Sequence, residues 1–118
     1  MKVLQLMQNL NNEVITLFHD SINYSLTREG IAFDDLKVSI HIHEGSYLQI
    51  DCDITQEDTV KTYTVCAVKD NVLYALCNTS VYWKYYDENQ SVIEIVDESS
   101  TIDDVVQRFI KYITHKNA

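Results

Sequence analysis

Apolar and polar residues alternate through two neighbouring runs of the chain, and this alternation constrains the fold more than any other feature. The first run extends from Leu36 to His43 and the second from Leu48 to Ile54, with Glu44-Gly45-Ser46 between them. A period of two residues is typical of a half-buried strand, and a connection that contains glycine predicts a β-hairpin. A three-residue loop keeps both apolar sets on one face, whereas a two-residue loop separates them. We therefore predict that Ile42 lies opposite Leu48, Ile40 opposite Ile50 and Val38 opposite Cys52.

The same reasoning extends the sheet as a meander. After a polar loop over residues 55–59, the run Val60–Val68 is predicted to place Ile54 against Val60. This register sets Lys61 beside Asp53, with Lys37 on the other side of the same carboxylate. Asp70-Asn71 suits a two-residue turn into Val72–Cys77.

Two further strands are predicted over Val81–Tyr86 and Val92–Val96, with Lys84 against Glu94 and Trp83 against Ile95. One face of the sheet then collects most of the apolar side chains and is predicted to be the core. Its members are Val38, Ile40, Ile42, Leu48, Ile50, Cys52, Val60, Cys66, Val68, Leu73, Ala75, Trp83, Ile93 and Ile95.

Both ends of the chain show helical periodicity instead. Apolar residues recur at steps of three and four from Val3 to Ile22, with Gly30 as a terminator and the Asn11-Asn12 pair as a weak point. Near the C-terminus, Ser100 or Thr101 suits the N-cap of a helix whose apolar stripe runs from Ile102 to Ile113. The prediction is a single α+β domain over residues 1–118: an N-terminal helix, an antiparallel meander of five to six strands and a C-terminal helix, with both helices on the core face.

Net charge narrows the classes of partner. Nine Lys and Arg against eighteen Asp and Glu give −9 over 118 residues, which disfavours nucleic acid and anionic membranes as partners. No uncharged apolar run reaches the length of a membrane span, and polar residues interrupt the first ten positions, so a cytoplasmic location is expected. Cys52, Cys66 and Cys77 match no zinc-binding spacing, and we expect reduced core residues and no cofactor.

The second face of the predicted sheet is unusual, because it combines tyrosines with aliphatic residues. Its members are Tyr47, Tyr63, Val65, Val72, Tyr74, Leu76, Tyr82 and Tyr86. Either the C-terminal helix or a loop covers this face, or it binds a partner, since tyrosine is enriched at interfaces. Acidic pairs at loops and element ends are suited to steer a basic partner toward it. The candidate partner-binding residues are Tyr47, Tyr63, Tyr74, Tyr82, Tyr86, Asp87, Glu88, Asp97 and Glu98.

His41, His43 and Asp51 are the residues most suggestive of chemistry. Two imidazoles and a carboxylate on one polar face suit a zinc or copper site, and His41 with Asp51 suits a general-base pair. No fourth ligand, nucleophile or oxyanion-binding loop accompanies them in the sequence, and two glycines form no phosphate-binding loop. We expect no metal and no enzymatic activity.

The sequence predicts a small, acidic α+β chain without a catalytic motif. In this overall profile the protein resembles the immunity proteins of bacterial polymorphic toxins, including those of contact-dependent growth inhibition. The resemblance covers the whole chain and rests on no shared motif. It implies a protein that binds a cognate toxin domain, often a basic nuclease, and blocks its action.

Two alternatives remain. Type III secretion chaperones are similar in size and charge, and the stretch from Phe33-Asp34-Asp35 to Leu48-Gln49-Ile50-Asp51 resembles their early strands, which implies a homodimer. Those chaperones insert a helix within the strand series, where this chain shows only strand periodicity. An inhibitor that mimics nucleic acid should carry its charge densely along one face, whereas here the acidic pairs are scattered.

Overall fold

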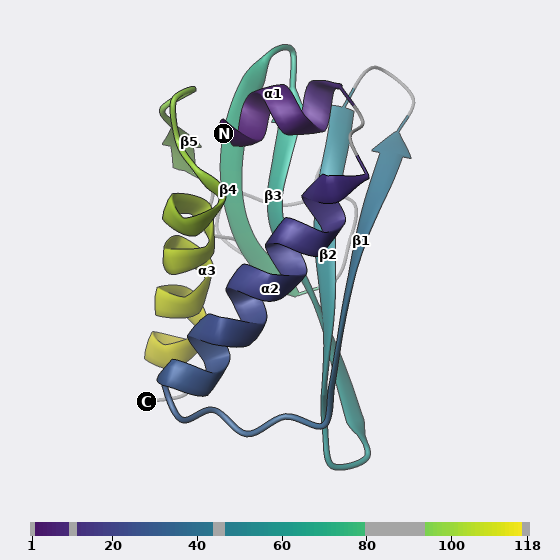
Figure 1. The fold of residues 1–118 in the computed structure, drawn as a ribbon, viewed down its shortest axis with the longest axis vertical. Helices are drawn as coiled ribbons and strands as arrows, with labels where there is room; N and C mark the ends of the chain where they lie inside the picture. Colours follow the sequence, from purple (N-terminus) through teal and green to yellow (C-terminus); the bar gives the residue numbers. More distant parts are fainter. Residues whose placement is uncertain (1, 10–11, 44–46, 80–93, 117–118) are drawn as a thin grey trace.

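The computed structural model describes residues 2–9, 12–43, 47–79 and 94–116, in which three helices cover one face of an antiparallel sheet (Figure 1). The helices are α1 (Val3–Gln8), α2 (Glu13–Arg28) and α3 (Ile102–Lys116). The strands are β1 (Asp35–His43), β2 (Tyr47–Gln56), β3 (Thr59–Lys69), β4 (Val72–Thr79) and β5 (Glu94–Val96), and they lie in the order β1-β2-β3-β4-β5. The predicted α+β architecture is therefore confirmed.

The predicted N-terminal helix is divided into α1 and α2. α1 ends at Gln8 and α2 begins at Glu13, so the division falls in the part of the sequence that contains the Asn11-Asn12 weak point. At the other end of α2, Gly30 has a φ of +71° and ends the helix as predicted. The N–H of Gly30 donates to Thr27 O and that of Ile31 to Leu26 O, the Schellman arrangement that turns the chain toward β1.

The first hairpin has the predicted register. Ile42 lies opposite Leu48, Ile40 opposite Ile50 and Val38 opposite Cys52, and Lys37 lies opposite Asp53. The pairing runs without a shift from Asp35 to His43. Ile50 and Cys52 are buried beneath the helices, but Ile42 at the far end of β1 is 67% exposed and does not belong to the core.

The predicted register between β2 and β3 is wrong by one residue. Ile54 lies opposite Lys61, and Asp53 lies opposite Thr62, which donates a hydrogen bond of 2.7 Å to its carboxylate. The cause is a two-residue turn at Glu57-Asp58, tighter than the predicted loop. Because a one-residue slip exchanges the two faces of a strand, Val60 is 58% exposed and not in the core.

An irregularity at Val65 restores the alternation further along β3. Ile50 pairs with Cys66 while Asp51 pairs with Thr64, so β3 has one extra residue at this point. Before this β-bulge Tyr63 faces the helices, and after it Cys66 and Val68 do. Cys66 and Val68 therefore occupy their predicted places in the core, although the register that led to that prediction was wrong.

The Glu57-Asp58 turn gives a testable prediction, because Glu57 has a φ of +55°. A side chain in this left-handed region costs about 1 kcal/mol, which glycine avoids. Glu57→Gly is expected to raise the free energy of unfolding by about 0.5–1 kcal/mol in urea titrations. Asn71→Gly is the control: Asn71 also has a positive φ (63°), which asparagine tolerates, and its side chain accepts a hydrogen bond from Gln8 at 2.7 Å, so no gain above about 0.5 kcal/mol is expected. Equal gains in both variants would contradict the explanation.

The end of the sheet departs from the predicted meander. The Asp70-Asn71 turn into β4 is confirmed, since Lys69 pairs with Val72 and both turn residues have positive φ. However, β5 pairs directly with β4, with Ile95 opposite Tyr74 and Val96 opposite Leu73. Ile95 is 71% exposed and Val96 is buried, so the predicted core position of Ile95 is wrong. Trp83, Lys84 and Ile93 lie outside the described residues.

The C-terminal helix begins as predicted. The Thr101 hydroxyl accepts a hydrogen bond from Asp104 N–H, and the Asp104 carboxylate accepts one from Thr101 N–H, a reciprocal capping box. The same region binds the start of the chain, because Val3 N–H donates to Ser100 O at 3.0 Å and Lys2 forms a β-bridge with Thr101.

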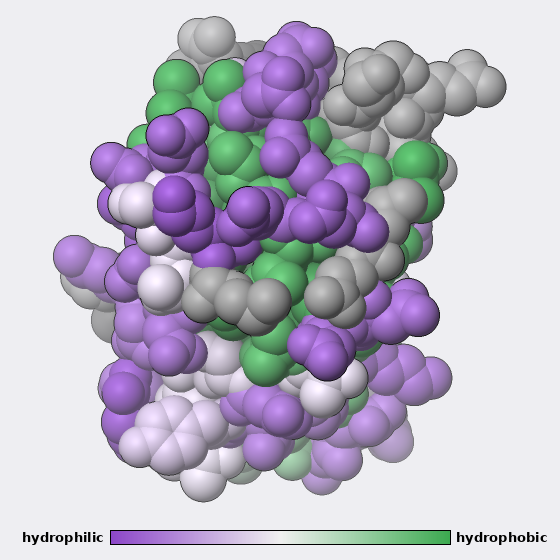
Figure 2. Space-filling view, turned by 45° about the horizontal axis from the view of Figure 1, so that its top comes forward, coloured by the Kyte–Doolittle hydropathy of each residue, from purple (hydrophilic) through white to green (hydrophobic). Residues whose placement is uncertain are grey.

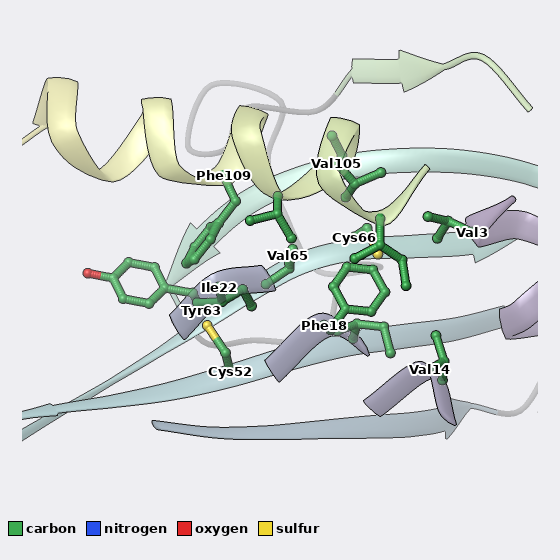
Figure 3. Close-up of a cluster of buried hydrophobic side chains, with 14 of the residues drawn as sticks. Val3, Val14, Phe18, Ile22, Cys52, Tyr63, Val65, Cys66, Val105 and Phe109 are labelled. Carbon is green, nitrogen blue, oxygen red and sulfur yellow. The ribbon is translucent and has the colours of Figure 1, made fainter. Parts of the chain in front are cut away.

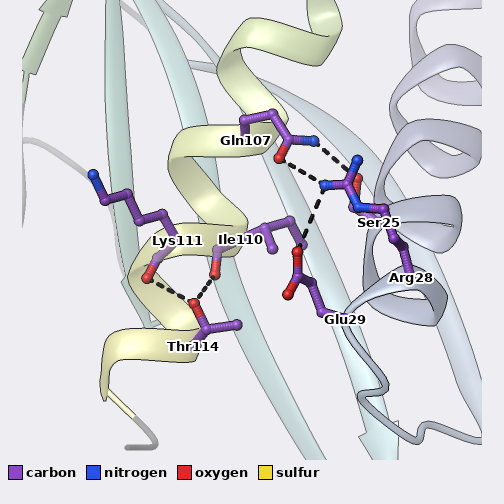
Figure 4. Close-up of polar contacts among 7 residues, drawn as sticks. All are labelled: Ser25, Arg28, Glu29, Gln107, Ile110, Lys111 and Thr114. Carbon is purple, nitrogen blue, oxygen red and sulfur yellow. Dashed lines mark hydrogen bonds and ion pairs between the residues drawn. The ribbon is translucent and has the colours of Figure 1, made fainter.

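Polar contacts connect α2 to α3 where the two helices lie side by side (Figure 4). Arg28 donates to the Gln107 side chain at 2.9 Å and lies 3.7 Å from the Glu29 carboxylate, while Gln107 donates to Ser25 at 3.2 Å. Nearer the start of α3, Ser21 donates to Asp103 at 2.7 Å. These contacts fix the two helices side by side over the sheet.

The core lies between this helical layer and the sheet (Figure 3). Phe18 and Ile22 of α2 and Val105 and Phe109 of α3 are fully buried against the strands. Cys52 and Cys66 are buried thiols among these residues, as predicted, and Cys66 Sγ lies 3.8 Å from Met7 Sδ. Cys77 lies in β4, where the structure does not describe its side chain.

Candidate functional site

Tyr63 is not available for partner binding. Its side chain is only 7% exposed and faces the helices, where its ring meets that of Phe109 edge-to-face at 5.4 Å (Figure 3). Burial raises the pKa of its phenol, with smaller contributions from Cys52 and Tyr112. Val65 is also fully buried. The prediction that both lie on the second face is wrong, because it followed from the incorrect β2–β3 register.

The other candidate tyrosines are only partly described. Tyr74 is half-buried on the face away from the helices, in register with Ala67 and the exposed Ile95. Tyr47 begins β2 opposite His43, and its side chain is not described, while Tyr82, Tyr86, Asp87 and Glu88 lie outside the described residues. The C-terminal helix packs on the opposite face, so it does not cover Tyr74 as one alternative proposed.

Asp97 has a structural role beside α3. Its carboxylate accepts hydrogen bonds from the backbone N–H and hydroxyl of Ser99, at 2.8 and 2.6 Å. These bonds, together with the nearby charge of Lys2, hold the pKa of Asp97 below its usual value. Glu98 is exposed at the tip of this turn. Asp97 therefore stabilises the turn that precedes α3, and Glu98 remains a candidate residue for contact with a partner.

A groove that the sequence did not reveal lies where the chain leaves α2 and approaches the β2–β3 turn, at the lower end of the molecule in Figure 1. Its volume is about 690 Å³. Ile31 and Phe33, both half-buried, supply apolar surface. The remaining lining residues are Ala32, Asp34, Gln56, Glu57, Thr59 and Lys61. We call it the acidic groove.

Hydrogen bonds hold the two walls of the acidic groove together. Gln56 donates from its side chain to Ala32 O at 2.8 Å, and Asp34 N–H donates to Thr55 O at 2.8 Å. The Asp34 carboxylate accepts the N–H of Glu57 at 2.7 Å. Because three bonds join segments more than 20 residues apart, the groove is built into the fold and does not depend on a partner for its shape.

Charge at the acidic groove is mostly negative. The neighbouring residues Asp34-Asp35 and Glu57-Asp58 bring two acidic pairs to one end of the molecule, all four exposed, with Lys61 as the basic residue in the lining. Apolar surface beside carboxylates suits a Lys- or Arg-containing segment, whose stems contact apolar atoms while the charged ends meet the carboxylates. Both acidic pairs were recognised in the sequence, but their proximity depends on tertiary structure.

The predicted contact between His41 and Asp51 is present. Asp51 Oδ2 lies 3.3 Å from His41 Nε2, and Ser39 Oγ lies 3.2 Å from the same nitrogen. In a catalytic triad, the nucleophile and the carboxylate contact different ring nitrogens of the histidine. Here Ser39 and Asp51 both contact Nε2 of His41, so the three residues do not form such a triad. The other oxygen of Asp51 accepts from the side-chain amide of Gln49, which also donates to Thr64. The arrangement is a polar network across three strands.

Metal ligands do not gather in the described part of the chain: no group of three or more His, Cys, Asp and Glu there is able to hold an ion. The side chain of His43, the third member of the predicted set, is not described. None of the described helices has the length and apolar character needed to cross a membrane.

The surface on the helix side, seen tilted in Figure 2, is mainly hydrophilic, with apolar side chains visible between the polar ones. The acidic groove is thus the described feature that combines volume, apolar lining and unbalanced charge. Searches against protein-family models, curated proteins and solved structures found no match, so the functional argument rests on this geometry and on the charge of the chain.

Proposed function

We propose that this chain is a non-enzymatic immunity protein, which binds and neutralises a cognate basic toxin domain in the bacterial cytoplasm. The observation that carries the proposal is the acidic groove, where Asp34 and Glu57, one member of each acidic pair, lie beside apolar surface in a chain of net charge −9. Long-range attraction raises the rate at which a basic partner arrives, and contacts with Ile31 and Phe33 slow its departure. A nuclease domain is a suitable partner, because a surface that binds nucleic acid is basic.

The strand series favours this proposal over a secretion chaperone. From Asp35 to Thr79 the described residues form four consecutive strands with no helix between them. The chaperones place a helix within that series. The scattered acidic positions disfavour mimicry of nucleic acid, since Asp20 on α2 and Glu98 before α3 lie on other elements than the groove pairs.

Co-expression tests the proposal directly. The C-terminal domain encoded by the neighbouring reading frame is expected to arrest growth when expressed alone, and this chain is expected to restore growth and to copurify with that domain. Growth arrest that persists despite normal levels of this chain would refute the proposal. Rescue of secretion of a neighbouring effector, without any toxicity, would support the chaperone instead.

His41 provides the test against an enzymatic function. If the chain only binds, His41→Ala is expected to leave neutralisation of the toxin unchanged, because His41 is distant in register from the groove residues and contacts Ser39 and Asp51 instead. The measurement is growth rescue at matched protein levels. Rescue that depends on turnover of a substrate and disappears in His41→Ala would overturn the non-enzymatic assignment.

A further inference from the structure

β1 forms the long edge of the sheet, with β2 as its neighbour in the described strand order. It pairs with β2 through nine residues without a bulge and contains no proline. An edge strand of this length presents a row of backbone N–H and C=O groups on its outer side, which is a template for another strand. The opposite edge, β5, has three residues in the described part of the chain. β1 is therefore the edge most suited to strand addition.

Charge indicates what kind of strand fits there. β1 contains one acidic residue, Asp35, against Lys37, with His41 and His43 besides, so it carries no net negative charge in a chain whose net charge is −9. The short edge β5 is instead followed by Asp97 and Glu98. Repulsion between two copies of this acidic chain is consequently weakest where their β1 strands meet.

We infer that β1 pairs antiparallel with β1 of a second copy, about a two-fold axis at Ser39. Ser39 is the midpoint of Asp35–His43, so this register uses all nine residues of each strand. It places Leu36 opposite Ile42 of the second copy and Val38 opposite Ile40 of the second copy. Ile42, 67% exposed in the single chain, gains an apolar neighbour, and Asp35 lies opposite a histidine position of the second copy.

The association is weak by this geometry, because two edge strands bury less surface than a standard interface. Sedimentation velocity from about 1 μM to about 1 mM covers the relevant range of affinity. Higher salt is expected to strengthen the dimer by screening like charges, whereas it weakens a complex with a basic partner. The inference does not depend on the proposed function: growth rescue tests the immunity assignment, and sedimentation of the isolated chain tests the dimer.

Ile42→Lys is the decisive variant. In the dimer the substitution places one lysine opposite Leu36 at each end of the paired strands, and it is expected to weaken dimerisation about tenfold or more. The folded monomer should be little affected, because Ile42 is exposed. Val60→Lys is the matched control, since Val60 is a similarly exposed aliphatic residue and the charge change is the same. Equal weakening by both variants, or a wild-type chain that stays monomeric throughout the range, would overturn the inference.

The position of the axis has its own test. Ser39→Cys brings two thiols directly opposite each other, so mild oxidation with oxidised glutathione is expected to form a disulfide-linked dimer. Asn23→Cys, on the exposed side of α2, is the control and is expected to form no disulfide-linked dimer, as is the wild-type chain. Cross-linking of Asn23→Cys as fast as Ser39→Cys would exclude pairing about Ser39.

Discussion

Phe109→Ala is expected to lower the free energy of unfolding by about 3–5 kcal/mol, the largest loss that we predict from a single substitution. Phe109 is fully buried on α3, and its ring packs edge-to-face on Tyr63 of β3 at 5.4 Å. Removing it eliminates buried apolar contacts and leaves a cavity at the junction between α3 and the sheet. Urea unfolding followed by circular dichroism measures the loss.

Tyr24→Ala is the control for this experiment. Tyr24 is also an aromatic residue on a helix, but it is 66% exposed and contacts Arg28 through a cation–π interaction at 5.8 Å. Its removal is expected to cost less than about 1 kcal/mol. If Phe109→Ala were as mild as Tyr24→Ala, the packing of α3 on Tyr63 would be wrong, and Tyr63 would return to the set of candidate contact residues.

Asp58→Lys is expected to slow association with the cognate toxin domain about tenfold at low ionic strength. The substitution changes the charge by two units next to Glu57, which lines the acidic groove together with Asp34. Since steering acts on the encounter, the association rate should change far more than the dissociation rate. Stopped-flow measurements over a series of salt concentrations separate the two rates, and the difference between variant and wild type should shrink as salt rises.

Asp20→Lys is the matched variant, because it changes the net charge equally at an exposed position on α2. It is expected to slow association less than Asp58→Lys. Equal slowing by the two variants would mean that net charge alone attracts the partner and that the acidic groove is not where the partner binds. The toxin would then be expected to contact another surface, such as the neighbourhood of Tyr74 and Ile95.

The sequence was sufficient for the first hairpin but not for the second. Between β1 and β2, strict alternation and the loop at Gly45 leave one register that buries a single apolar face. Between β2 and β3, the turn places Glu57 at positive φ, where sequence patterns favour Gly or Asn, and so it was not recognised. That turn decides that Tyr63 faces the core, and the extra residue at Val65, which has no signature in the pattern, returns Cys66 and Val68 to the same face.

The candidate site was less predictable than the fold. Each half of the acidic groove comes from a different segment, and the bond between Asp34 and Glu57 joins residues 23 positions apart. Composition identified the acidic pairs, but a pattern along the chain does not report which loops meet. The contact between His41 and Asp51 was predictable because it lies within the hairpin whose register was correct.

The bonds from Val3 to Ser100 and from Lys2 to Thr101 have a consequence for synthesis on the ribosome. Lys2 and Val3 contact a segment made almost one hundred residues later, so α1 waits for this partner until Thr101 has been synthesised. Until α3 follows, Tyr63 and the helix-facing side of β3 lack their cover. Such long sequence separation slows folding and leaves apolar surface open in the nascent chain. Completion of this fold therefore requires the synthesis of α3, and chains truncated before α3 are expected to be substrates for chaperones and proteases.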